Sequence, residues 1–275
     1  MPIRVVFTGA TGRVGRSMVP AILRSTEFAL VGAVGRQRAG EDVGAALGMR
    51  EAGVRLESDV EEAVRGTGGQ VLIDFSAPEV AVKHCRAGIE AGMAVVMGTT
   101  GMTPEDVAQL GRLADSRGVG AFKAPNLTLA GHLMLRCAEL VRRYMGDVEI
   151  IEAHMPEKLD SPSGTSIETA ERLDRVGGPP PGTDHTRFGL PESRGARVGS
   201  VRIHSLRLPS IYDHQEVLFS RPGELLTIRY EQYTTEPLVG PTLRAARLVL
   251  GARGLVYDFP GLFEEDLPIS AHTNS

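Results

Sequence analysis

The sequence predicts an α/β protein in which a doubly wound parallel sheet precedes a smaller α+β domain with a mixed or antiparallel sheet. Up to Ala124, short apolar runs alternate with helical patterns, as expected of βαβ units. From Asn126 onward this alternation stops, and three strand-like segments follow one another without helices between them. A length of 275 residues suits two modest domains.

The first half contains four apolar, β-branched runs that predict buried parallel strands. These expected strands are residues 3–7, 28–34, 71–75 and 94–97. The segments between them carry the spacing of amphipathic helices. The expected helices are residues 17–23, 60–65, 80–91 and 104–116.

The second half predicts a different order of elements. The expected helices are residues 129–145, 167–175 and 241–250, and the expected strands are 148–153, 198–206, 215–219 and 225–233. We therefore predict a dinucleotide-sized first domain over 1–125 and a second domain over 126–235. The segment 236–275 is expected to return to the first domain, with a loosely held tail from Tyr257.

Composition excludes several classes of protein. The net charge of −4 gives no support for a nucleic-acid partner, and no apolar run approaches the ~18 residues that span a bilayer. Cys85 and Cys137 are far apart and are expected to be ordinary buried thiols, which favours a reducing, cytoplasmic setting. We predict no metal site. A surplus of glycine, 33 residues, indicates many tight turns and close backbone approaches.

A glycine-rich loop directly follows the first predicted strand and opens the first helix. Its glycines, Gly9, Gly12 and Gly15, suit a tight turn, close approach of a pyrophosphate and packing of helix on strand. The helix N-terminus adds free N–H groups and a partial positive charge. We predict a Rossmann-type dinucleotide site here. The alternative is a strand–helix turn of the same fold without a cofactor. The loop residues expected to contact the cofactor are Gly9, Thr11, Gly12, Arg13, Val14 and Gly15.

The end of the second strand indicates which dinucleotide is preferred. An acidic residue there would bind the ribose of NAD, whereas arginine accommodates the 2′-phosphate of NADP. This chain has Arg36 and Arg38 and no acid until Glu41, while Arg13 adds a second positive charge from the glycine loop. We predict that NADPH is preferred and NADH possible. The alternative is that these arginines are only solvated loop cations.

Two further turns follow the third and fourth strands. Because ligands bind outside the carboxyl ends of strands in open α/β sheets, these turns are expected to face the ribose and nicotinamide. The residues concerned are Phe75, Gly98, Thr99 and Thr100.

The segment 152–166 leaves a strand, crosses a loop and enters a helix. Ser161 is expected to be the N-cap and Pro162 the first helical residue. The open first turn that follows would offer N–H groups and hydroxyls to a carboxylate. Its expected substrate-binding residues are Ser163, Gly164 and Thr165.

Two candidate catalytic residues, His154 and Lys158, lie just upstream of this turn. Lysine supplies a fixed positive charge, and histidine can move a proton near neutral pH. Together they predict a pocket for a small carboxylated substrate that is reduced and protonated. Taken singly, each residue could equally be an ordinary core or surface side chain.

The run from Lys158 to Ser166 resembles the signature of the dihydrodipicolinate reductases, in which histidines and a lysine precede Asp-Ala-Pro-Ser-Gly-Thr-Ala. Other segments similar to this family occur in the family's order, at residues 9–15, 74–79, 98–101, 124–126 and 222–224. The resemblance implies a Rossmann domain, a hinged substrate domain, a homotetramer and hydride transfer to a cyclic unsaturated dicarboxylate of diaminopimelate and lysine biosynthesis.

The resemblance also assigns roles to residues. His154 takes the position of the family's catalytic histidine, and Lys158 that of the lysine implicated in proton donation and carboxylate binding. Ser163, Gly164 and Thr165 would hold a substrate carboxylate. Ala124 and Asn126 would line the nicotinamide pocket together with residues 98–101.

Several positions depart from the family pattern, mostly on the substrate side. Met155 stands in place of the second histidine, and residues 208–214 replace a glycine-rich run. Lys123 and His132 are unusual at their positions and are candidates to compensate for Met155. Two alternatives therefore remain: the same fold and cofactor acting on another carboxylated imine or ketone, or an NADP-binding sensor without catalysis, which the run 8–15 would also suit.

Overall fold

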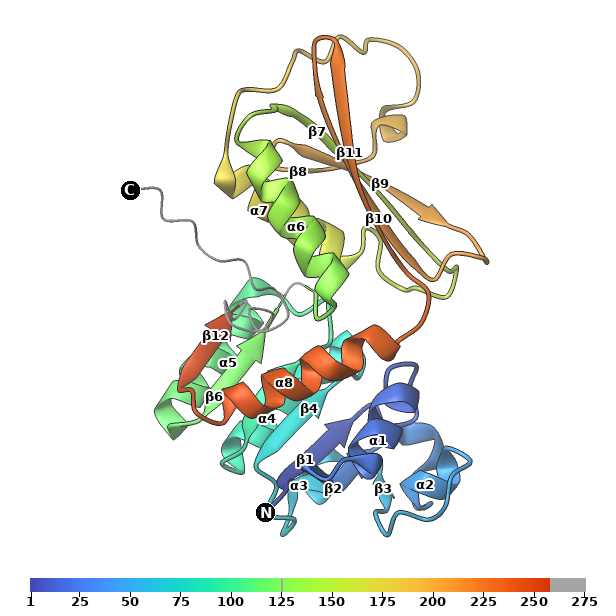
Figure 1. Ribbon diagram of the computed structural model, residues 1–275, viewed down its shortest axis with the longest axis vertical. Coiled ribbons are helices and arrows are strands. Elements are labelled where there is room, and N and C mark those ends of the chain that lie inside the picture. The colour runs from blue at the N-terminus through green and yellow to red at the C-terminus, as the bar shows by residue number, and fades with distance from the viewer. Residues whose placement is uncertain (125, 258–275) are drawn as a thin grey trace. The chain divides into compact units, whose positions relative to one another are not determined.

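The structure, a computed structural model, describes residues 1–124 and 126–257 and contains two separate sheets (Figure 1). Within the described residues, 1–124, 126–127 and 235–257 form the first unit, and Thr128–Thr234 form the second. The predicted fold class is confirmed, because the first unit is built on a parallel sheet flanked by helices and the second on a mixed sheet.

The sheet of the first unit has seven strands in the order β12-β6-β5-β4-β1-β2-β3, and every neighbouring pair is parallel. The strands are β1 (Ile3–Thr8), β2 (Phe28–Val34), β3 (Leu56–Glu57), β4 (Val71–Asp74), β5 (Ala94–Met97), β6 (Gly120–Lys123) and β12 (Gly254–Tyr257). The chain winds outward from β1 in both directions, so the carboxyl ends of β1, β4 and β5 lie along one edge.

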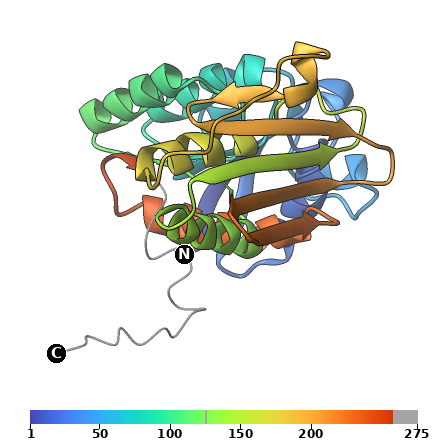
Figure 2. The same ribbon diagram turned by 90° about the horizontal axis from the view of Figure 1, so that it is seen from above.

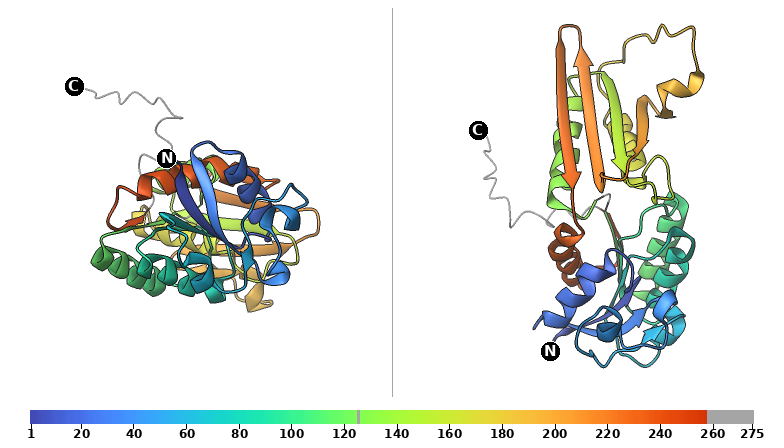
Figure 3. Two further views of the ribbon diagram at one scale, coloured as in Figure 1. Left: turned by 90° about the horizontal axis from the view of Figure 1, so that it is seen from below. Right: turned by 90° about the vertical axis from the view of Figure 1, so that its right-hand side faces the viewer.

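Helices cover both faces of this sheet, which explains why its inner strands are continuous apolar runs rather than alternating ones. The helices are α1 (Gly15–Arg24), α2 (Val43–Ala46), α3 (Val60–Val64), α4 (Pro78–Glu90), α5 (Pro104–Arg117) and α8 (Val239–Val249), with short 3-10 turns at Arg36–Arg38 and Glu236–Leu238. Helices α3, α4 and α5 pack side by side, whereas α1 packs beside α8 on the opposite face (Figure 3, left).

The returning C-terminal segment ends in a strand that the sequence analysis did not predict. After α8, strand β12 pairs in parallel with β6, Gly254 opposite Gly120 and Tyr257 opposite Lys123. β12 contains four residues, too few for a periodic signal. The tail predicted to be loosely held, beyond Tyr257, lies outside the described residues.

The second unit has five strands in the order β11-β10-β7-β9-β8 (Figure 2). Its strands are β7 (Asp147–His154), β8 (Ala196–Val198), β9 (Val201–Arg207), β10 (Asp213–Arg221) and β11 (Glu224–Gln232). β7 is central, antiparallel to β10 and parallel to β9.

Two helices, α6 (Leu129–Arg142) and α7 (Gly164–Val176), pack together and against this sheet. A shared core joins them to the strands, with Met134 and Leu173 from the helices meeting Ile150 and Phe219 from the sheet. Along β7, Glu152 and His154 continue the face that carries Ile150. A 3-10 turn at Pro191–Arg194 interrupts the long connection between α7 and β8.

Two expected elements of the second unit were wrong in extent. The single strand expected over 198–206 is two antiparallel strands, because Gly199 adopts a φ of +56° and Asp174 accepts hydrogen bonds from the Ser200 backbone and hydroxyl at the turn. The helix expected to reach residue 145 ends at Arg142. Within the described residues, no helix has both the length and the apolar character that crossing a bilayer requires.

The packing of α5 on β12 can be tested at Gly111. A methyl group added there would lie 2.7 Å from Leu255 Cβ, so the helix and strand would have to separate. Alanine favours a helix over glycine by about 1 kcal/mol, but overpacking costs about 1–3 kcal/mol. We expect Gly111→Ala to lower the free energy of unfolding by about 1 kcal/mol in urea titrations. Ser116→Ala, at an exposed position of α5, is the control; a Gly111→Ala protein as stable as wild type would contradict this packing.

Candidate functional site

The glycine-rich loop of the first unit leaves no room for side chains at its key positions. Gly9 has a φ of +84°, and a Cβ atom there would collide with the carbonyl oxygen of Phe75. A Cβ atom on Gly15 would collide with the carbonyls of Gly9 and Ala10. The loop is therefore a backbone-lined turn of the kind that a dinucleotide pyrophosphate approaches.

Helix α1 begins at the end of this loop. Its N-cap residue is Val14, whose side chain makes no capping hydrogen bond. The N-terminus of α1 can therefore present backbone N–H groups and a partial positive charge to a phosphate. Thr11 lies beside Gly35, where β2 ends and Arg36 follows, so the loop and the predicted 2′-phosphate residues meet at one edge. The residues present fit a dinucleotide.

The arginines after β2 differ in their surroundings. Arg38 donates to both carboxylate oxygens of Glu41, at 3.1 and 2.6 Å, and to the carbonyl of Ala46. Its charge is therefore balanced locally by Glu41. Arg36 is exposed at the start of the same 3-10 turn. Arg13 is exposed in the glycine loop, and its carbonyl accepts a hydrogen bond from Thr235.

The turns after β4 and β5 pack against one another. The Phe75 ring lies against the backbone of Gly98, where no Cβ atom would fit, and stacks on Phe7 at 6.2 Å. Thr99 is buried and its hydroxyl donates to Asp74, while Thr100 is half-buried.

After β6, Ala124 is buried and Asn126 half-buried; residue 125, between them, lies outside the described residues. Lys123 is buried as well, with Nζ 3.4 Å from the carbonyls of Thr99 and Ala124. The cofactor-facing residues predicted from sequence therefore lie at the carboxyl edge of the first sheet.

In the second unit, His154 lies at the end of β7 between two carboxylates. Its Nδ1 is 2.5 Å from Glu152 Oε2, and its Nε2 is 3.1 Å from Asp213 Oδ1. Burial opposes protonation of the ring, but the hydrogen bonds to Asp213 and Glu152 outweigh it and raise the pKa of His154 above its ordinary 6.5. The geometry therefore favours an imidazolium whose two N–H groups are both engaged.

The strand register explains these partners. Asp213 of β10 and Arg207 of β9 both stand opposite His154, one on each side of β7. Arg207 Nη1 donates to Glu152 Oε1 at 3.0 Å, and Glu152 is fully buried. Burial would raise the pKa of Glu152, but the hydrogen bonds from His154, Ser205 and Arg207 lower it.

Lys158 and the start of α7 form a second pair with a carboxylate. Lys158 Nζ is 2.8 Å from Asp160 Oδ1, and Asp160 Oδ2 accepts from the Gly164 N–H at 3.1 Å. Despite burial, the Lys158 contact and the Gly164 N–H lower the pKa of Asp160. Arg207 Nη2 also donates to the Asp160 carbonyl at 2.7 Å, which joins this pair to the His154 cluster.

The expected cap of this helix was wrong. α7 begins at Gly164 and its N-cap is Ser163, whose hydroxyl accepts from the Ser166 N–H at 3.2 Å, so neither Ser161 nor Pro162 belongs to the helix. Ser166 in turn donates to Gln215 of β10 at 2.8 Å, which fixes the first turn to the sheet. The Thr165 side chain is half-buried in that turn.

The structure thus brings His154, Lys158 and the first turn of α7 together, as the sequence predicted. It adds four residues that were not among the predicted site residues: Glu152, Asp160, Arg207 and Asp213. Glu152 could have been found from its i, i+2 spacing to His154 on one strand face. Asp213 and Arg207 could not, since their positions depend on register between distant strands.

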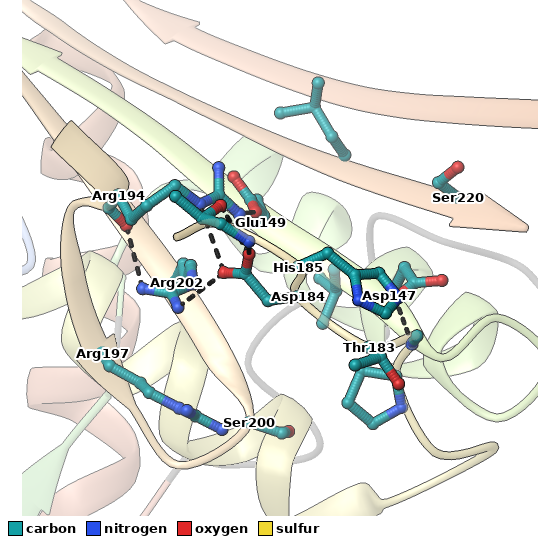
Figure 4. Close-up of a pocket in the computed structure, with 15 residues that line it drawn as sticks. Asp147, Glu149, Thr183, Asp184, His185, Arg194, Arg197, Ser200, Arg202 and Ser220 are labelled. Atoms are coloured by element: carbon teal, nitrogen blue, oxygen red, sulfur yellow. Dashed lines mark hydrogen bonds and ion pairs between the residues drawn. The ribbon is translucent and has the colours of Figure 1, made fainter. Parts of the chain in front are cut away.

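A cavity of about 710 Å³ in the second unit lies at the other end of β7 (Figure 4). Asp147 and Glu149 line it, roughly 20 Å of strand away from His154. Two of its arginines already meet acids: Arg194 is 2.5 Å from Glu149 and Arg202 is 3.1 Å from Asp184. None of the predicted catalytic or substrate-binding residues lines this cavity.

Comparisons with known proteins agree on one family. Residues 3–127 match the family model described as dihydrodipicolinate reductase, N-terminus, and residues 128–262 match the corresponding C-terminus model. The chain is 38% identical over 266 residues to the 4-hydroxy-tetrahydrodipicolinate reductase of Moorella thermoacetica, covering 95% of this chain and 98% of that relative. The reductase of the same name from Desulfitobacterium hafniense is 36% identical over 264 residues, covering 95% and 99%.

Solved structures show the same relationship. Dipicolinate-bound dihydrodipicolinate reductase from Paenisporosarcina sp. TG-14 superposes with a TM-score of 0.73 and 29% identity, covering 97% of this chain and all of that one. An amine dehydrogenase from Mycobacterium smegmatis, at 17% identity and a TM-score of 0.63 over 93% and 95% of the two chains, shares the fold alone.

The contacts of His154 predict that its pKa depends on the nearby carboxylate of Asp213. Because the pKa of His154 is raised, its protonation stabilises the fold below the ordinary pKa of 6.5, and this contribution is lost as pH rises through the higher folded value. Asp213→Asn removes one of the two charges, so we expect the pKa of His154 to fall in an NMR titration. Asp184→Asn, which removes a carboxylate beside Arg202, should leave it unchanged. An unshifted His154 in Asp213→Asn would refute the assigned contact.

Proposed function

The chain belongs to the dihydrodipicolinate reductase family and is a nicotinamide-dependent reductase of the 4-hydroxy-tetrahydrodipicolinate type; we propose how its own residues bind, orient and protonate the substrate. The pathway that follows from the family is diaminopimelate and lysine biosynthesis. The observation that carries the proposal is the cluster of His154, Lys158 and the α7 N-terminus, which joins two side-chain cations to backbone N–H donors.

The cluster is balanced in charge. Its three carboxylates face three basic side chains. The carboxylates are those of Glu152, Asp160 and Asp213, and the basic side chains are those of His154, Lys158 and Arg207. An arriving dicarboxylate therefore has to exchange with carboxylates already present. We assign that exchange to Asp160 and Asp213, so that substrate carboxylates meet Lys158, His154 and the N–H groups of Gly164 and Thr165. Ser163 holds this turn in place through its cap.

Reduction adds a hydride and a proton across a double bond of the dihydrodipicolinate ring, which forms when the 4-hydroxyl group of the substrate leaves as water. The reduced nicotinamide, when bound, supplies the hydride. We assign the proton to Lys158, because its ammonium group has three N–H donors and Asp160 engages one of its faces. His154 holds both ring protons against carboxylates, so it serves as a fixed positive charge that orients a substrate carboxylate.

We propose that the first unit binds the dinucleotide and that NADPH is preferred over NADH. The support is the backbone-lined turn from Gly9 to Gly15, the α1 N-terminus and the absence of an acid directly after β2. Arg36 is the residue we assign to the 2′-phosphate, and Arg13 supplies a second positive charge from the glycine loop. Arg38 contributes less because Glu41 neutralises it. Phe75, residues 98–100, Ala124 and Asn126 would line the ribose and nicotinamide.

A second candidate substrate class, another carboxylated imine or ketone, rests on Met155. This apolar side chain occupies a position where the family pattern has histidine, directly after His154. A coupled assay that supplies the product of the preceding synthase together with NADPH distinguishes the two classes. Oxidation of NADPH supports the dihydrodipicolinate class, and no oxidation supports another carboxylated substrate.

We also propose a homotetramer and a cytoplasmic location. Alternation along β9 turns His204 and Leu206 away from the face that packs on the helices, and Leu206 is 45% exposed. Such an apolar side chain on the free face of a sheet suits contact with a second copy. Cys85 and Cys137 are both free thiols, which suits a reducing compartment; Cys85 is buried as expected, but Cys137 is exposed, so the expected burial was wrong there.

Lys158→Ala tests the proton assignment. We expect turnover to fall by about two to four powers of ten, because general-acid catalysis contributes about that much, with weaker binding of pyridine-2,6-dicarboxylate. Steady-state kinetics and titration of that inhibitor measure the two effects. Lys83→Ala, an exposed lysine on α4, is the control. Turnover near that of wild type in Lys158→Ala would remove the assigned role.

Arg36→Ala tests the cofactor preference. Losing an arginine that pairs with a phosphate should raise the KM for NADPH by about tenfold or more and leave the KM for NADH nearly unchanged. Arg38→Ala is the matched variant, because Arg38 is paired with Glu41 and should affect NADPH less. Equal changes for both cofactors in Arg36→Ala, or none, would contradict the assignment.

A further inference from the structure

A fully buried carboxylate, Asp74, lies at the end of β4 beneath the turns assigned to the nicotinamide. Its Oδ1 accepts hydrogen bonds from the hydroxyls of Thr8 at 2.5 Å and Ser76 at 2.7 Å. The same oxygen is 3.1 Å from Nδ1 of His84 on α4. Its Oδ2 accepts from the hydroxyl of Thr99. One side chain thus ties together the ends of β1 and β5, the turn after β4 and helix α4.

Phe75 connects the same turns from a neighbouring position in the chain. Its carbonyl lies so close to Gly9, and its ring so close to Gly98, that neither glycine could carry a side chain. Any change in the direction of the residues after β4 therefore moves the Phe75 ring against the turn at Gly98, whereas the loop at Gly9 is also held by hydrogen bonds to β2. The position of Phe75 depends in turn on Asp74, the residue immediately before it.

The cost of burying Asp74 indicates that this arrangement has a purpose beyond closing a strand. A buried carboxylate loses several kcal/mol of hydration unless donors replace the water, and apolar packing at the same place would avoid that cost. Four donors from four segments meet it here. The reduction proposed above uses none of these groups as acid, base or carboxylate anchor.

We propose that Asp74 is a positioning residue that sets the geometry of the nicotinamide half of the cofactor site. It acts through Phe75 and Thr99 and does not itself touch the cofactor. The proposal rests on the proposed function of the first unit as the NADPH-binding unit.

The adenosine half of the cofactor site is held separately. The N–H groups of Gly9 and Ala10 donate to the Val34 carbonyl at 3.1 and 2.9 Å, so β2 anchors the glycine-rich loop. Arg36 follows the same strand. Loss of the Asp74 carboxylate should therefore disturb the nicotinamide side and spare the phosphate and adenosine side.

Asp74→Asn tests this separation. The amide keeps the size of the side chain but replaces one of the two acceptor oxygens by an NH₂ group, so either Thr99 on one side or Thr8 and Ser76 on the other lose their acceptor. Calorimetric titration compares NADPH with adenosine 2′,5′-bisphosphate, which lacks the nicotinamide half. We expect the Kd of NADPH to rise at least tenfold and the Kd of the fragment to stay within twofold of wild type. Asp115→Asn, an exposed carboxylate of α5 in the same unit, should change neither.

The outcomes separate the proposal from its premise. An unchanged Kd for NADPH in Asp74→Asn, or an equal rise for both ligands, overturns the positioning role, because the second result describes a general loss of structure. If Asp74→Asn does not fold, Thr8→Val takes its place, since it removes one donor and keeps a β-branched strand residue. A selective rise of about threefold for NADPH then supports the proposal, and no rise overturns it. Wild-type protein that binds neither ligand would instead overturn the proposed function.

Discussion

Each unit of this protein is organised around one fully buried carboxylate at the end of a central strand. Asp74 ends β4 in the first unit, and Glu152 lies near the end of β7 in the second; both side chains are 0% exposed. A buried charge is tolerated only when donors or opposite charges surround it. This requirement decides which residues must approach the strand ends. Thr99 in the first unit and His154 in the second, both candidate site residues, are among them.

Strand register meets this requirement in both units. In the first sheet, Thr8 of β1 stands opposite Asp74, and Met97 of β5 stands opposite it on the other side, which delivers Thr99 two residues later. In the second sheet, Arg207 stands opposite His154 from the parallel strand β9. A shift of one residue in either pairing would turn these side chains to the other face and leave a buried charge unmet. The register and the buried carboxylates therefore stabilise each other.

The sequence predicted the parts of the site that follow from local patterns. The glycine-rich loop and the two neighbouring basic residues His154 and Lys158 lie within short stretches whose residue types have direct physical meaning. Asp213 lies far from His154 in the sequence, and only the register between β7 and β10 shows that the two residues stand opposite each other. The N-cap was misplaced for a related reason: Ser161 and Ser163 are equally good caps by type, and the buried contact of Ser166 with Gln215 selects the second.

The fold, like the site, was predictable where the evidence lay in local sequence patterns. Apolar runs identified four of the seven strands of the first sheet, β1, β2, β4 and β5, because helices cover both of its faces, but β6 was missed. β3 and β12, with two and four residues, carry no periodicity, and their pairing with β2 and β6 depends on the whole sheet. Gly199 divides β8 from β9 because its φ is +56°. The sequence does not show this angle, so Gly199 could not be distinguished from glycines that lie inside a continuous strand.

The three carboxylates around His154 and Lys158 differ in solvent exposure. This difference distinguishes the carboxylate with a structural role from the two that we propose a substrate replaces. Glu152 is fully buried and bound by His154 and Arg207, so its removal would take a buried carboxylate partner from both cations. The side chains of Asp213 and Asp160 are 26% and 36% exposed and reach His154 and Lys158 from the solvent side. In the exchange proposed above, water would hydrate these two carboxylates as they withdraw, which lowers the cost of replacing them. Glu152 would keep the charge of His154 in place, so that the proposed site stays cationic when an anionic substrate arrives.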